Sequence, residues 1–400
     1  MRRVVVILLQ LVFCACGVHA QRNDSVTVAD DSSNFVTASI LILEPTNAIV
    51  SVFGHVAVRM ECPSENLDYV FTLENNPNAN AFTTGIMAKA PACYVAVPAS
   101  VYINDAKSFK RGLVQYELNL NLQEKRELWR LLDENIANKN HGNFNLRTNS
   151  CLSVAIQAVQ NCLAFDHFEW GEMKFPRTLC DGDFLRYSLQ KAPWSEFIFV
   201  SFCGSLYGKH SPEENRMTPE SIIGLLKDAR FVDSASGEWR PVIAGDGVTI
   251  VKAEHEYRAS FWSPLVVFGI LFLLTLLVTA AQWMLKWDTT AHWFDLFLFS
   301  FQALIFALML YVCLFSEIFG EVWNWYFIAF FPFPLVILIA GDRQNSPRWW
   351  LFYSCLLLLF VLSTPFIGVL DMPHQLITCS IMVRSFWRYL INLKRNVVVK

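Results

Sequence analysis

The hydrophobic positions of the chain follow three successive patterns. Short apolar runs rich in β-branched residues occupy 36–120, helical spacing follows over 123–163, and long apolar runs fill most of the last third. β-branched runs predict strands, spacings of three and four residues predict amphipathic helices, and runs of about twenty apolar residues predict membrane spans. The sequence therefore indicates an α+β domain followed by an all-α bundle in a membrane.

Turn sequences separate the predicted strands. A Pro-Thr-Asn turn stands between the first two apolar runs, and Asn75-Asn76-Pro77-Asn78 follows the fourth. Polar turn residues between β-branched runs are typical of hairpins. The expected strands are Val36–Leu43, Ala48–Phe53, Gly54–Met60, Leu67–Leu73, Cys93–Val97 and Leu113–Leu120.

A helix is predicted over Gln123–Ala137. Asn121 precedes it as a cap, and Glu124 stands three residues later at the capping-box spacing. Further along, residues 165–259 mix loops with short helices such as Pro219–Lys227 and define no clear architecture. The buried stripe of the first helix is expected to comprise Leu128, Leu131, Leu132 and Ile136.

A second amphipathic helix is predicted to begin around Cys151. Thr148 or Asn149 is a possible N-cap, which places Cys151 in the first turn. Unpaired N–H groups and the positive end of the helix dipole favour a thiolate there, and the thiolate is the reactive form of cysteine. The apolar face of this helix is expected to comprise Leu152, Ala155, Ile156, Val159 and Leu163.

Five apolar segments follow residue 261. Basic residues stand between alternate segments and in the tail at 394–400, so five spans would put every basic cluster in the cytoplasm, whereas four would leave the tail outside. We therefore expect five spans, although Arg384 and Arg388 weaken the last. The segments are Trp262–Leu285, Trp293–Phe315, Trp323–Ala340, Trp349–Leu370 and Leu376–Leu393.

The N-terminus has the form of a secretory signal peptide. Residues 1–20 combine a basic start, a short apolar stretch and a small residue at the end, and 21–35 form a polar lead-in. A lipid anchor at Cys14 or Cys16 is a weaker alternative. The expected organisation is 1–20 signal peptide, 21–35 lead-in, 36–260 exported domain, 261–393 membrane helices and 394–400 cytoplasmic tail.

Composition and charge narrow the possible functions. The chain is 54% hydrophobic and 17% charged, with a net charge of −3, so it lacks the basic excess typical of nucleic-acid binders. Export permits disulfides, and the pairs considered are Cys62 with Cys93 and Cys162 with Cys180. A zinc set of His55, Cys62, Cys93 and Cys151 lacks the usual ligand spacing, so no metal or cofactor is expected.

A cysteine at a helix start and a histidine at the start of a strand suggest thiol chemistry. In papain-like hydrolases the imidazole takes the proton of the thiol and later protonates the leaving group. Here His55 precedes Cys151, an order that suits circularly permuted members of that superfamily. From the spacing alone, a structural or disulfide-bonded cysteine and a buried core histidine remain alternatives. Glu317 and Asp295, near the ends of apolar segments, are expected at the membrane interface.

Several motifs together resemble the bacterial family of Lnb N-terminal periplasmic domain proteins. These are Phe53–Arg59, Leu67–Phe71, Leu118–Lys125 and Asn149–Cys151 in the exported part, and Phe315–Glu317, Trp323–Trp325, Pro332 and Pro334 in the membrane part. The family is similar, more distantly, to permuted thiol hydrolases and acyltransferases related to NlpC and to lecithin:retinol acyltransferase. The resemblance implies a permuted papain-like, NlpC-type exported domain.

The resemblance also implies roles for individual residues. Cys151 would be the nucleophile and His55 the base, with Asp68, or secondarily Glu61, orienting the imidazole. The backbone N–H of Cys151 and the side chain of Asn149 would form an oxyanion hole. Ser150 and Phe144 depart from the family pattern, which puts the oxyanion and loop contacts in doubt but leaves the Cys–His pair intact.

These expectations define a function and two alternatives. The first is a cysteine-dependent hydrolase or acyltransferase at the outer face of the bacterial inner membrane, acting on an amide, ester or lipid-linked acyl group in a lipid, a lipoprotein or a cell-wall peptide. The second is a non-catalytic assembly factor or chaperone that uses the fold as a binding module. A redox or signal sensor is a third. The expected partners are lipids of the bilayer and no nucleic acid, and the sequence gives no oligomeric state.

Overall fold

The computed structural model describes residues 36–46, 51–75, 90–138, 142–145, 148–163, 166–171, 189, 191–203, 219–254, 261–316, 324–340, 346–366 and 371–398. The expected signal peptide and lead-in lie outside the described residues. The chain divides into the units Met1–Phe35 and Val36–Lys400, and the described residues belong to the second.

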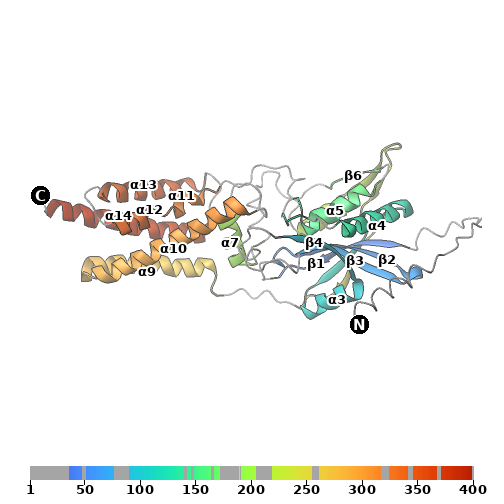
Figure 1. Ribbon diagram of the computed structural model, residues 1–400, viewed down its shortest axis with the longest axis horizontal. Helices are drawn as coiled ribbons and strands as arrows, with labels where there is room; N and C mark the ends of the chain where they lie inside the picture. Colours follow the sequence, from blue (N-terminus) through green and yellow to red (C-terminus); the bar gives the residue numbers. More distant parts are fainter. Residues whose placement is uncertain are drawn as a thin grey trace, which may run out of the picture. The chain divides into compact units, whose positions relative to one another are not determined.

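Six antiparallel strands form the main sheet of the N-terminal domain (Figure 1). Their spatial order is β4-β3-β2-β1-β5-β9, so the strand nearest the membrane helices in sequence, β9, closes one edge. β2 and β3 are joined by the short turn at 63–66, which fixes their register. The strands are β1 (Thr37–Leu43), β2 (His55–Cys62), β3 (Leu67–Asn75), β4 (Ala92–Pro98), β5 (Leu113–Glu117) and β9 (Val248–Val251).

Helices cover both faces of this sheet (Figure 1). On one face lies α3 (Ala99–Ser108), whose Tyr102 packs with Ala57 of β2 and Val70 of β3. The other face carries α4 (Leu122–Ala137) and α5 (Cys151–Asn161), which contact each other, and α5 contacts β2 and β3. Because side chains alternate along a strand, each face supplies a separate set of apolar residues to the core.

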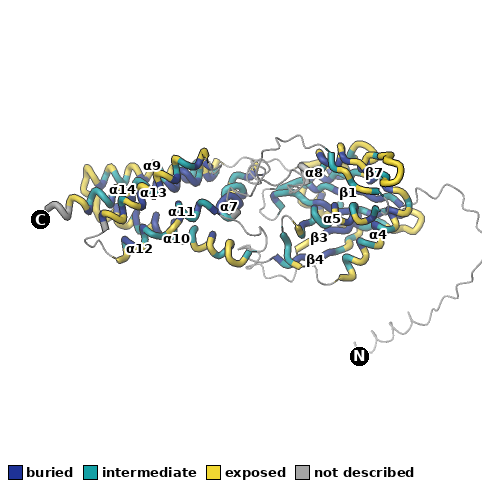
Figure 2. The backbone as a smooth tube through the Cα atoms, turned by 90° about the horizontal axis from the view of Figure 1, so that it is seen from above, coloured by how far each residue is buried: buried dark blue, intermediate teal, exposed yellow. Residues whose placement is uncertain are grey.

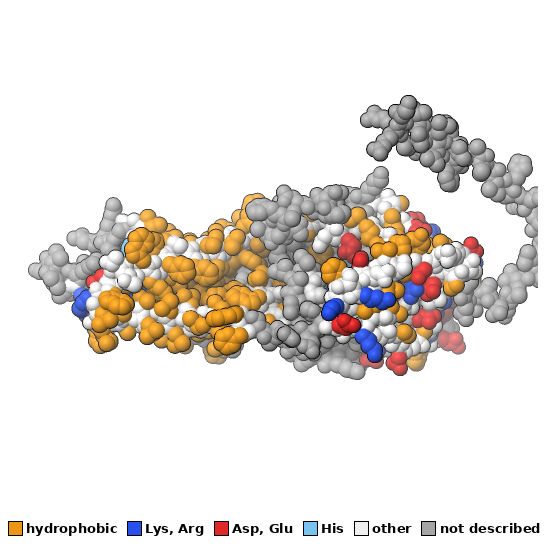
Figure 3. All heavy atoms as spheres, turned by 90° about the horizontal axis from the view of Figure 1, so that it is seen from below, with side chains coloured by type: hydrophobic (Ala, Val, Ile, Leu, Met, Phe, Trp, Pro, Cys, Tyr) orange, Lys and Arg blue, Asp and Glu red, His pale blue; other side chains and the backbone are white. Residues whose placement is uncertain are grey.

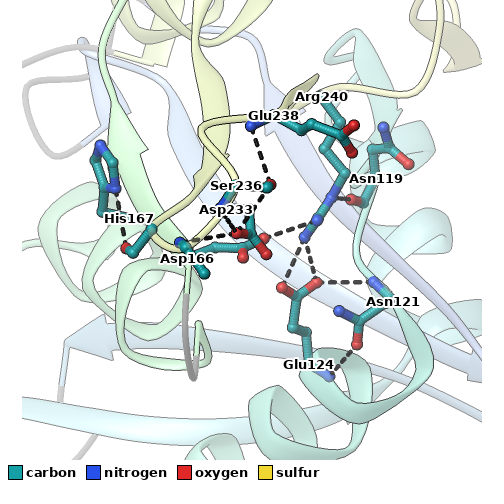
Figure 4. Close-up of polar contacts among 11 residues, drawn as sticks. Asn119, Asn121, Glu124, Asp166, His167, Asp233, Ser236, Glu238 and Arg240 are labelled. Atoms are coloured by element: carbon teal, nitrogen blue, oxygen red, sulfur yellow. Dashed lines mark hydrogen bonds and ion pairs between the residues drawn. The ribbon is translucent and has the colours of Figure 1, made fainter.

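A small second sheet packs against the start of α4. It consists of β6 (Asp166–Glu169), β7 (Arg230–Asp233) and β8 (Trp239–Pro241), and α8 (Pro219–Asp228) precedes β7. Arg240 of β8 donates to Glu124 at 2.6 Å and to Asp166 at 2.7 Å (Figure 4). Glu124 also completes a capping box with Asn121, so one guanidinium holds the second sheet to the capped end of α4.

Several local expectations are corrected by the structure. Residues Ser51–Phe53 form a turn rather than the end of a strand, and the rest of the Ala48–Phe53 prediction lies outside the described residues. Cys62 and Cys93 are free thiols and form no disulfide with each other, and Cys162 is also free. Cys180 lies outside the described residues. The N-cap of α5 is Ser150 rather than Thr148 or Asn149.

The C-terminal region is helical. α9 and α10 are each long and apolar enough to cross a membrane, and they are the two helices that meet this test in the described part of the chain. Phe331-Pro332 separates α11 from α12, because proline lacks the N–H that a continuous helix needs. The helices are α7 (Pro193–Cys203), α9 (Pro264–Leu285), α10 (Asp288–Phe315), α11 (Tyr326–Phe330), α12 (Phe333–Ala340), α13 (Ser346–Ser363) and α14 (Met372–Val398).

The outer surface of the helical region is apolar. Large side chains such as Leu273, Leu277, Phe297 and Leu304 are exposed on α9 and α10, where Figure 2 shows exposed residues along the helices. In Figure 3 hydrophobic atoms cover the visible face of this region, whereas charged side chains gather over the strand-containing domain. Exposed apolar surface of this extent is typical of a lipid-facing protein.

Polar side chains inside the helical region pair with one another. Asp295 of α10 accepts from Arg384 and Arg388 of α14, and Arg384 also donates to Gln282 and Thr279 of α9. Asp295 and Arg384 are completely buried inside the helical region, and the expected position of Asp295 at the membrane interface stays a prediction. Glu317 lies outside the described residues. The two arginines that weaken the apolar pattern of the last segment thus join three helices.

Candidate active site

The start of α5 holds Cys151 in its first turn. Ser150 Oγ accepts from the N–H of Ser153 at 3.1 Å, and the Ser153 hydroxyl accepts from the N–H of Ser150 at 2.7 Å. This reciprocal capping box satisfies two helix-end donors and fixes the direction in which the chain enters the helix. Cys151 follows the cap directly, so its position is set by the hydrogen bonds between these serine hydroxyls and the backbone.

His55 contacts this thiol from the beginning of β2. The Cys151 and His55 side chains are hydrogen-bonded, and the N–H of Val56 donates to the sulfur. Gly54 precedes the histidine with a φ of 81°, a left-handed conformation that side chains other than glycine rarely adopt. The tight turn at Gly54 therefore lets the strand begin beside the N-terminus of α5.

Two side chains of β3 bind the far nitrogen of the imidazole. His55 Nε2 lies 2.6 Å from Thr72 Oγ1 and 3.1 Å from Glu74 Oε1. Since these contacts occupy Nε2, Nδ1 is the nitrogen that faces Cys151. The carboxylate and hydroxyl hold the ring in one orientation, as the third group of a thiol hydrolase must.

Electrostatics in this cluster favour a thiolate–imidazolium pair. Burial opposes ionisation of Cys151, but the charge and hydrogen bond of His55 and the Val56 N–H lower its pKa below the ordinary value. Burial likewise opposes protonation of His55, but Cys151 and the hydrogen bond with Glu74 raise its pKa well above the ordinary value. Despite burial, contact with His55 also lowers the pKa of Glu74. All three shifts support the charged forms.

Cys162, at the opposite end of α5, provides an internal comparison. Burial raises the pKa of this thiol to about 12, and its sulfur donates to the carbonyl of Val159. Two cysteines on one helix therefore differ in chemistry: the thiol at the N-terminus is poised to ionise, and the one at the C-cap stays protonated.

Tyr102 adds a neutral donor near the pair. Its hydroxyl is buried and has no hydrogen-bond partner among the described residues. Burial raises its pKa, and the charges of His55, Glu74 and Cys151 act on it. A buried hydroxyl without a partner costs about 1–3 kcal/mol, so Tyr102 is an unsatisfied donor near the Cys151–His55 pair.

Asp68 does not lie beside the imidazole, which corrects the expected third group. Its carboxylate accepts two hydrogen bonds of 2.7 Å from Arg59. In the register of β2 with β3, Asp68 stands opposite Glu61, six residues along the strand from His55 and thus roughly 20 Å away. Glu61 pairs with Arg59 at 3.4 Å and is equally remote.

Asn149 lies at the edge of a cavity of about 360 Å³. Its side-chain N–H donates to the carbonyl of Asn143 at 2.8 Å, so this group is already engaged in the loop. Five carboxamide side chains and no charged group line the cavity, which suits a neutral, polar ligand portion. The lining residues are Leu73, Tyr94, Leu131, Asn135, Asn138, Asn149, Val154, Gln157, Ala158 and Asn161.

Other candidates from the sequence do not join the site. His167 contacts Ser234 and Glu169 on the second sheet. His141 and His210 lie outside the described residues. Among the residues that the structure describes, no three His, Cys, Asp or Glu side chains gather in a group able to hold a metal ion.

Models of known protein families match both the N-terminal domain and the C-terminal helical region. Residues 25–169 match the model of the Lnb N-terminal periplasmic domain, and residues 256–396 match that of the Lnb transmembrane domain. The protein is therefore a membrane protein with a periplasmic, mixed α/β N-terminal domain and a helical C-terminal region. It belongs to the Lnb N-terminal periplasmic domain family, which confirms the resemblance found in its motifs. No curated protein and no solved structure matches the chain.

Proposed function

We propose that this protein is a cysteine-dependent hydrolase or acyltransferase of the outer face of the inner membrane. Its substrate would carry an amide, an ester or a lipid-linked acyl group, and five membrane-crossing helices would hold the periplasmic domain close to the lipid. The observation that carries the proposal is the contact of Cys151 with His55, whose far nitrogen is bound by Thr72 and Glu74.

The order of elements supports a permuted papain-like domain. A cysteine at a helix N-terminus, a histidine at the start of a strand and a polar group on the neighbouring strand are the parts of a papain-like site. In this chain the histidine strand β2 precedes the cysteine helix α5. Gly54, Thr72 and Glu74 all belong to the hairpin that carries His55, so one supersecondary unit orients the base.

The proposed reaction has two steps. The Cys151 thiolate attacks the carbonyl carbon, and the tetrahedral intermediate collapses to a thioester as the leaving group takes the proton from His55 Nδ1. Water, or an acceptor amine or hydroxyl, then loses its proton to His55 and attacks the thioester. Cys151 leaves as thiolate and His55 returns to the imidazolium form.

Two donors are available for the oxyanion. The backbone N–H of Cys151 lies in the first helical turn, where N–H groups lack partners within the helix. The protonated hydroxyl of Tyr102 is buried without a partner in the described structure. We infer that these donors, more than the engaged amide of Asn149, stabilise the charge that develops on the carbonyl oxygen.

Cys151→Ala and Cys151→Ser test the mechanism in the purified, full-length protein. Turnover of acyl-ester and acyl-amide substrates in lipid-containing micelles should fall by at least about a thousandfold. Cys93→Ser is the matched control, because Cys93 is a half-buried thiol on β4, and it should keep full activity.

Trapping of the acyl-enzyme intermediate completes the experiment. Mass spectrometry should find an acyl adduct on Cys151 in the active protein and none on Cys162. Undiminished turnover by Cys151→Ala would overturn the proposal. A cellular function that survives Cys151→Ala while purified protein shows no turnover would instead favour the non-catalytic assembly factor.

A further inference from the structure

A group of three charged side chains joins α10 to α14 inside the helical region. Asp295 Oδ2 accepts from Arg388 Nε at 2.6 Å and from Arg384 Nη2 at 3.0 Å. Asp295 and Arg384 are completely buried, and Arg388 is 8% exposed. We refer to these three residues as the Asp295 cluster. One carboxylate is shared by two guanidinium groups, so the charges within the cluster do not balance.

The Asp295 cluster carries one positive charge in excess. The guanidinium of Arg384 also donates to the neutral side chains of Thr279 and Gln282. Arg388 Nη2 lies 3.2 Å from His292 Nδ1. A guanidinium can only donate, so this nitrogen of His292 accepts, and the ring supplies no negative charge. An uncompensated charge in apolar surroundings is costly, so binding of an anion from outside would stabilise the cluster.

Arg388 forms the open edge of the Asp295 cluster. Its Nε donates to Asp295 and its Nη2 contacts His292, whereas its Nη1 donates to no residue in the described part of the chain. Nη1 also retains contact with the surface, and the ring of His292 beside it is exposed. A guanidinium with a free donor and an excess of charge is a strong partner for a phosphate oxygen.

Exposed tryptophans indicate the depth of the cluster in the bilayer. Trp283 of α9, Trp287 in the connection and Trp293 of α10 are all exposed where α9 and α10 meet. Tryptophan is enriched at membrane–water interfaces. Asp295 stands seven residues after Asp288, the first residue of α10, which is roughly 10 Å along the helix axis. We therefore expect the open edge to lie within reach of the lipid headgroups.

Other charged residues along these helices add to the positive charge. Lys286 follows α9 and Lys394 lies six residues beyond Arg388 on α14, and both lysines are exposed. Asp288 opens α10 and accepts from Gln282 at 3.0 Å. Two lysines and one aspartate leave a second positive charge in excess. This charge favours an anionic headgroup over a zwitterionic one, whose ammonium group it repels.

We propose that the open edge of the Asp295 cluster binds the phosphate of an anionic phospholipid of the bilayer. Arg388 Nη1 donates to a phosphate oxygen, and the negative headgroup balances the excess charge. The acyl chains lie along exposed apolar side chains of α10 such as Phe297, a contact that a free phosphate ion lacks. The site is independent of the thiol chemistry proposed for Cys151.

Native mass spectrometry of the full-length protein, released from micelles, tests the preference for a headgroup. Phosphatidylglycerol and phosphatidylcholine with identical acyl chains are added at equal concentrations. The unchanged protein should retain at least about tenfold more phosphatidylglycerol, since each basic group near the membrane surface contributes about 1 kcal/mol. Equal retention of the two lipids would overturn the proposal, and this result needs no variant.

Arg388→Gln and Arg348→Gln are a matched pair of variants. Arg388→Gln leaves Asp295 paired one to one with Arg384, so the fold should be kept while the preference for phosphatidylglycerol is lost. Arg348→Gln removes the same charge from an exposed arginine in the first turn of α13 and should keep the preference. An equal loss in both variants would show that general surface charge attracts the lipid, and the assigned site would be wrong.

Inorganic phosphate distinguishes a lipid from a free anion. Phosphatidylglycerol should raise the melting temperature of the unchanged protein in micelles by several degrees, and inorganic phosphate at the same concentration should not. An equal rise with inorganic phosphate would overturn the assignment to a lipid. Cys151→Ala should retain phosphatidylglycerol as the unchanged protein does, so a failure of the proposed acyl chemistry leaves this test valid.

Discussion

At the scale of single residues, Glu74 determines over which pH range His55 keeps its second proton. Its carboxylate contacts Nε2, and that contact contributes to the raised pKa of His55. Glu74→Gln removes the negative charge, so the pKa of His55 should fall. As the pH rises, the imidazolium of the thiolate–imidazolium pair should then lose its proton at a lower pH than in the unchanged protein.

The measurement is the pH profile of kcat/KM, or of alkylation of Cys151 where turnover is too slow. The acid limb of the profile reports ionisation of the thiol and the alkaline limb reports deprotonation of His55. In Glu74→Gln the alkaline limb should move to lower pH, and the maximal rate should fall by roughly tenfold, about 1.4 kcal/mol. Asp68→Asn is the control. A shift of equal size in that variant would mean that Asp68 acts on the imidazole despite its distance.

Cys151 and His55 were identifiable from sequence because each is marked by its local pattern, but Glu74 was not. Identifying the third group requires the register between β2 and β3. Once the structure places the turn at residues 63–66, counting outwards from it pairs His55 with Glu74. The family resemblance, which implies a third group on a strand after His55, led to Asp68, which Arg59 binds instead.

At the scale of elements, the cap of α5 connects the stability of the helix with the position of the thiol. Ser150→Ala removes the acceptor for the N–H of Ser153 and should lower the free energy of unfolding by about 1 kcal/mol. Because Cys151 is the next residue, the thiol should also alkylate more slowly at neutral pH. Chemical denaturation and alkylation kinetics measure the two effects.

Ser108→Ala is the matched control for this cap. Ser108 is exposed at the end of α3 and donates only to a local carbonyl, so its loss should change stability by less than about 0.5 kcal/mol. Restored stability and alkylation in Ser150→Asp would show that the cap is responsible. An unchanged free energy in Ser150→Ala would show that the loop before α5 holds the helix start by itself.

Strongly patterned elements were predictable, and weakly patterned ones were not. The spacing of Leu152, Ala155, Ile156, Val159 and Leu163 predicts α5; the first four are buried, whereas Leu163 lies beyond the end of the helix. α3 was missed because Val101, Tyr102 and Ile103 favour strands locally, although Ala99, Tyr102 and Ala106 carry the helical spacing of its buried face. Here packing against the sheet overrides local preference.

At the scale of the whole molecule, buried polar clusters occur in both the strand-containing domain and the helical region. They include the thiol site, the group of Ser201, His374 and Asp371 between α7 and α14, and the cluster around Asp295. The sequence predicted that the last third is apolar and helical, because long apolar runs are unambiguous. It could not predict that Arg384 and Arg388 share one carboxylate on α10, because that pairing joins residues about ninety positions apart.

The pairing of Asp295 with Arg384 and Arg388 has a consequence for biogenesis. On insertion scales, an arginine at the centre of a helix costs about 2.5–3.5 kcal/mol, so α14 by itself is a poor substrate for membrane integration. We expect α14 to integrate once α10, with Asp295, is already in the bilayer. Translation order provides this, since α10 emerges from the ribosome first.

Glycosylation reporters fused to successive truncations measure integration. α14 placed alone behind a leader should fail to integrate, whereas the same segment behind α9 and α10 should integrate. Asp295→Ala should reduce integration of α14, and Gln302→Ala, which removes a buried amide of α10 bonded to Tyr353, should not. Efficient integration of α14 alone would show that its arginines need no partner. If the expected result holds, integration of the C-terminal helix depends on an earlier helix, and the bundle assembles in the order in which its helices are translated.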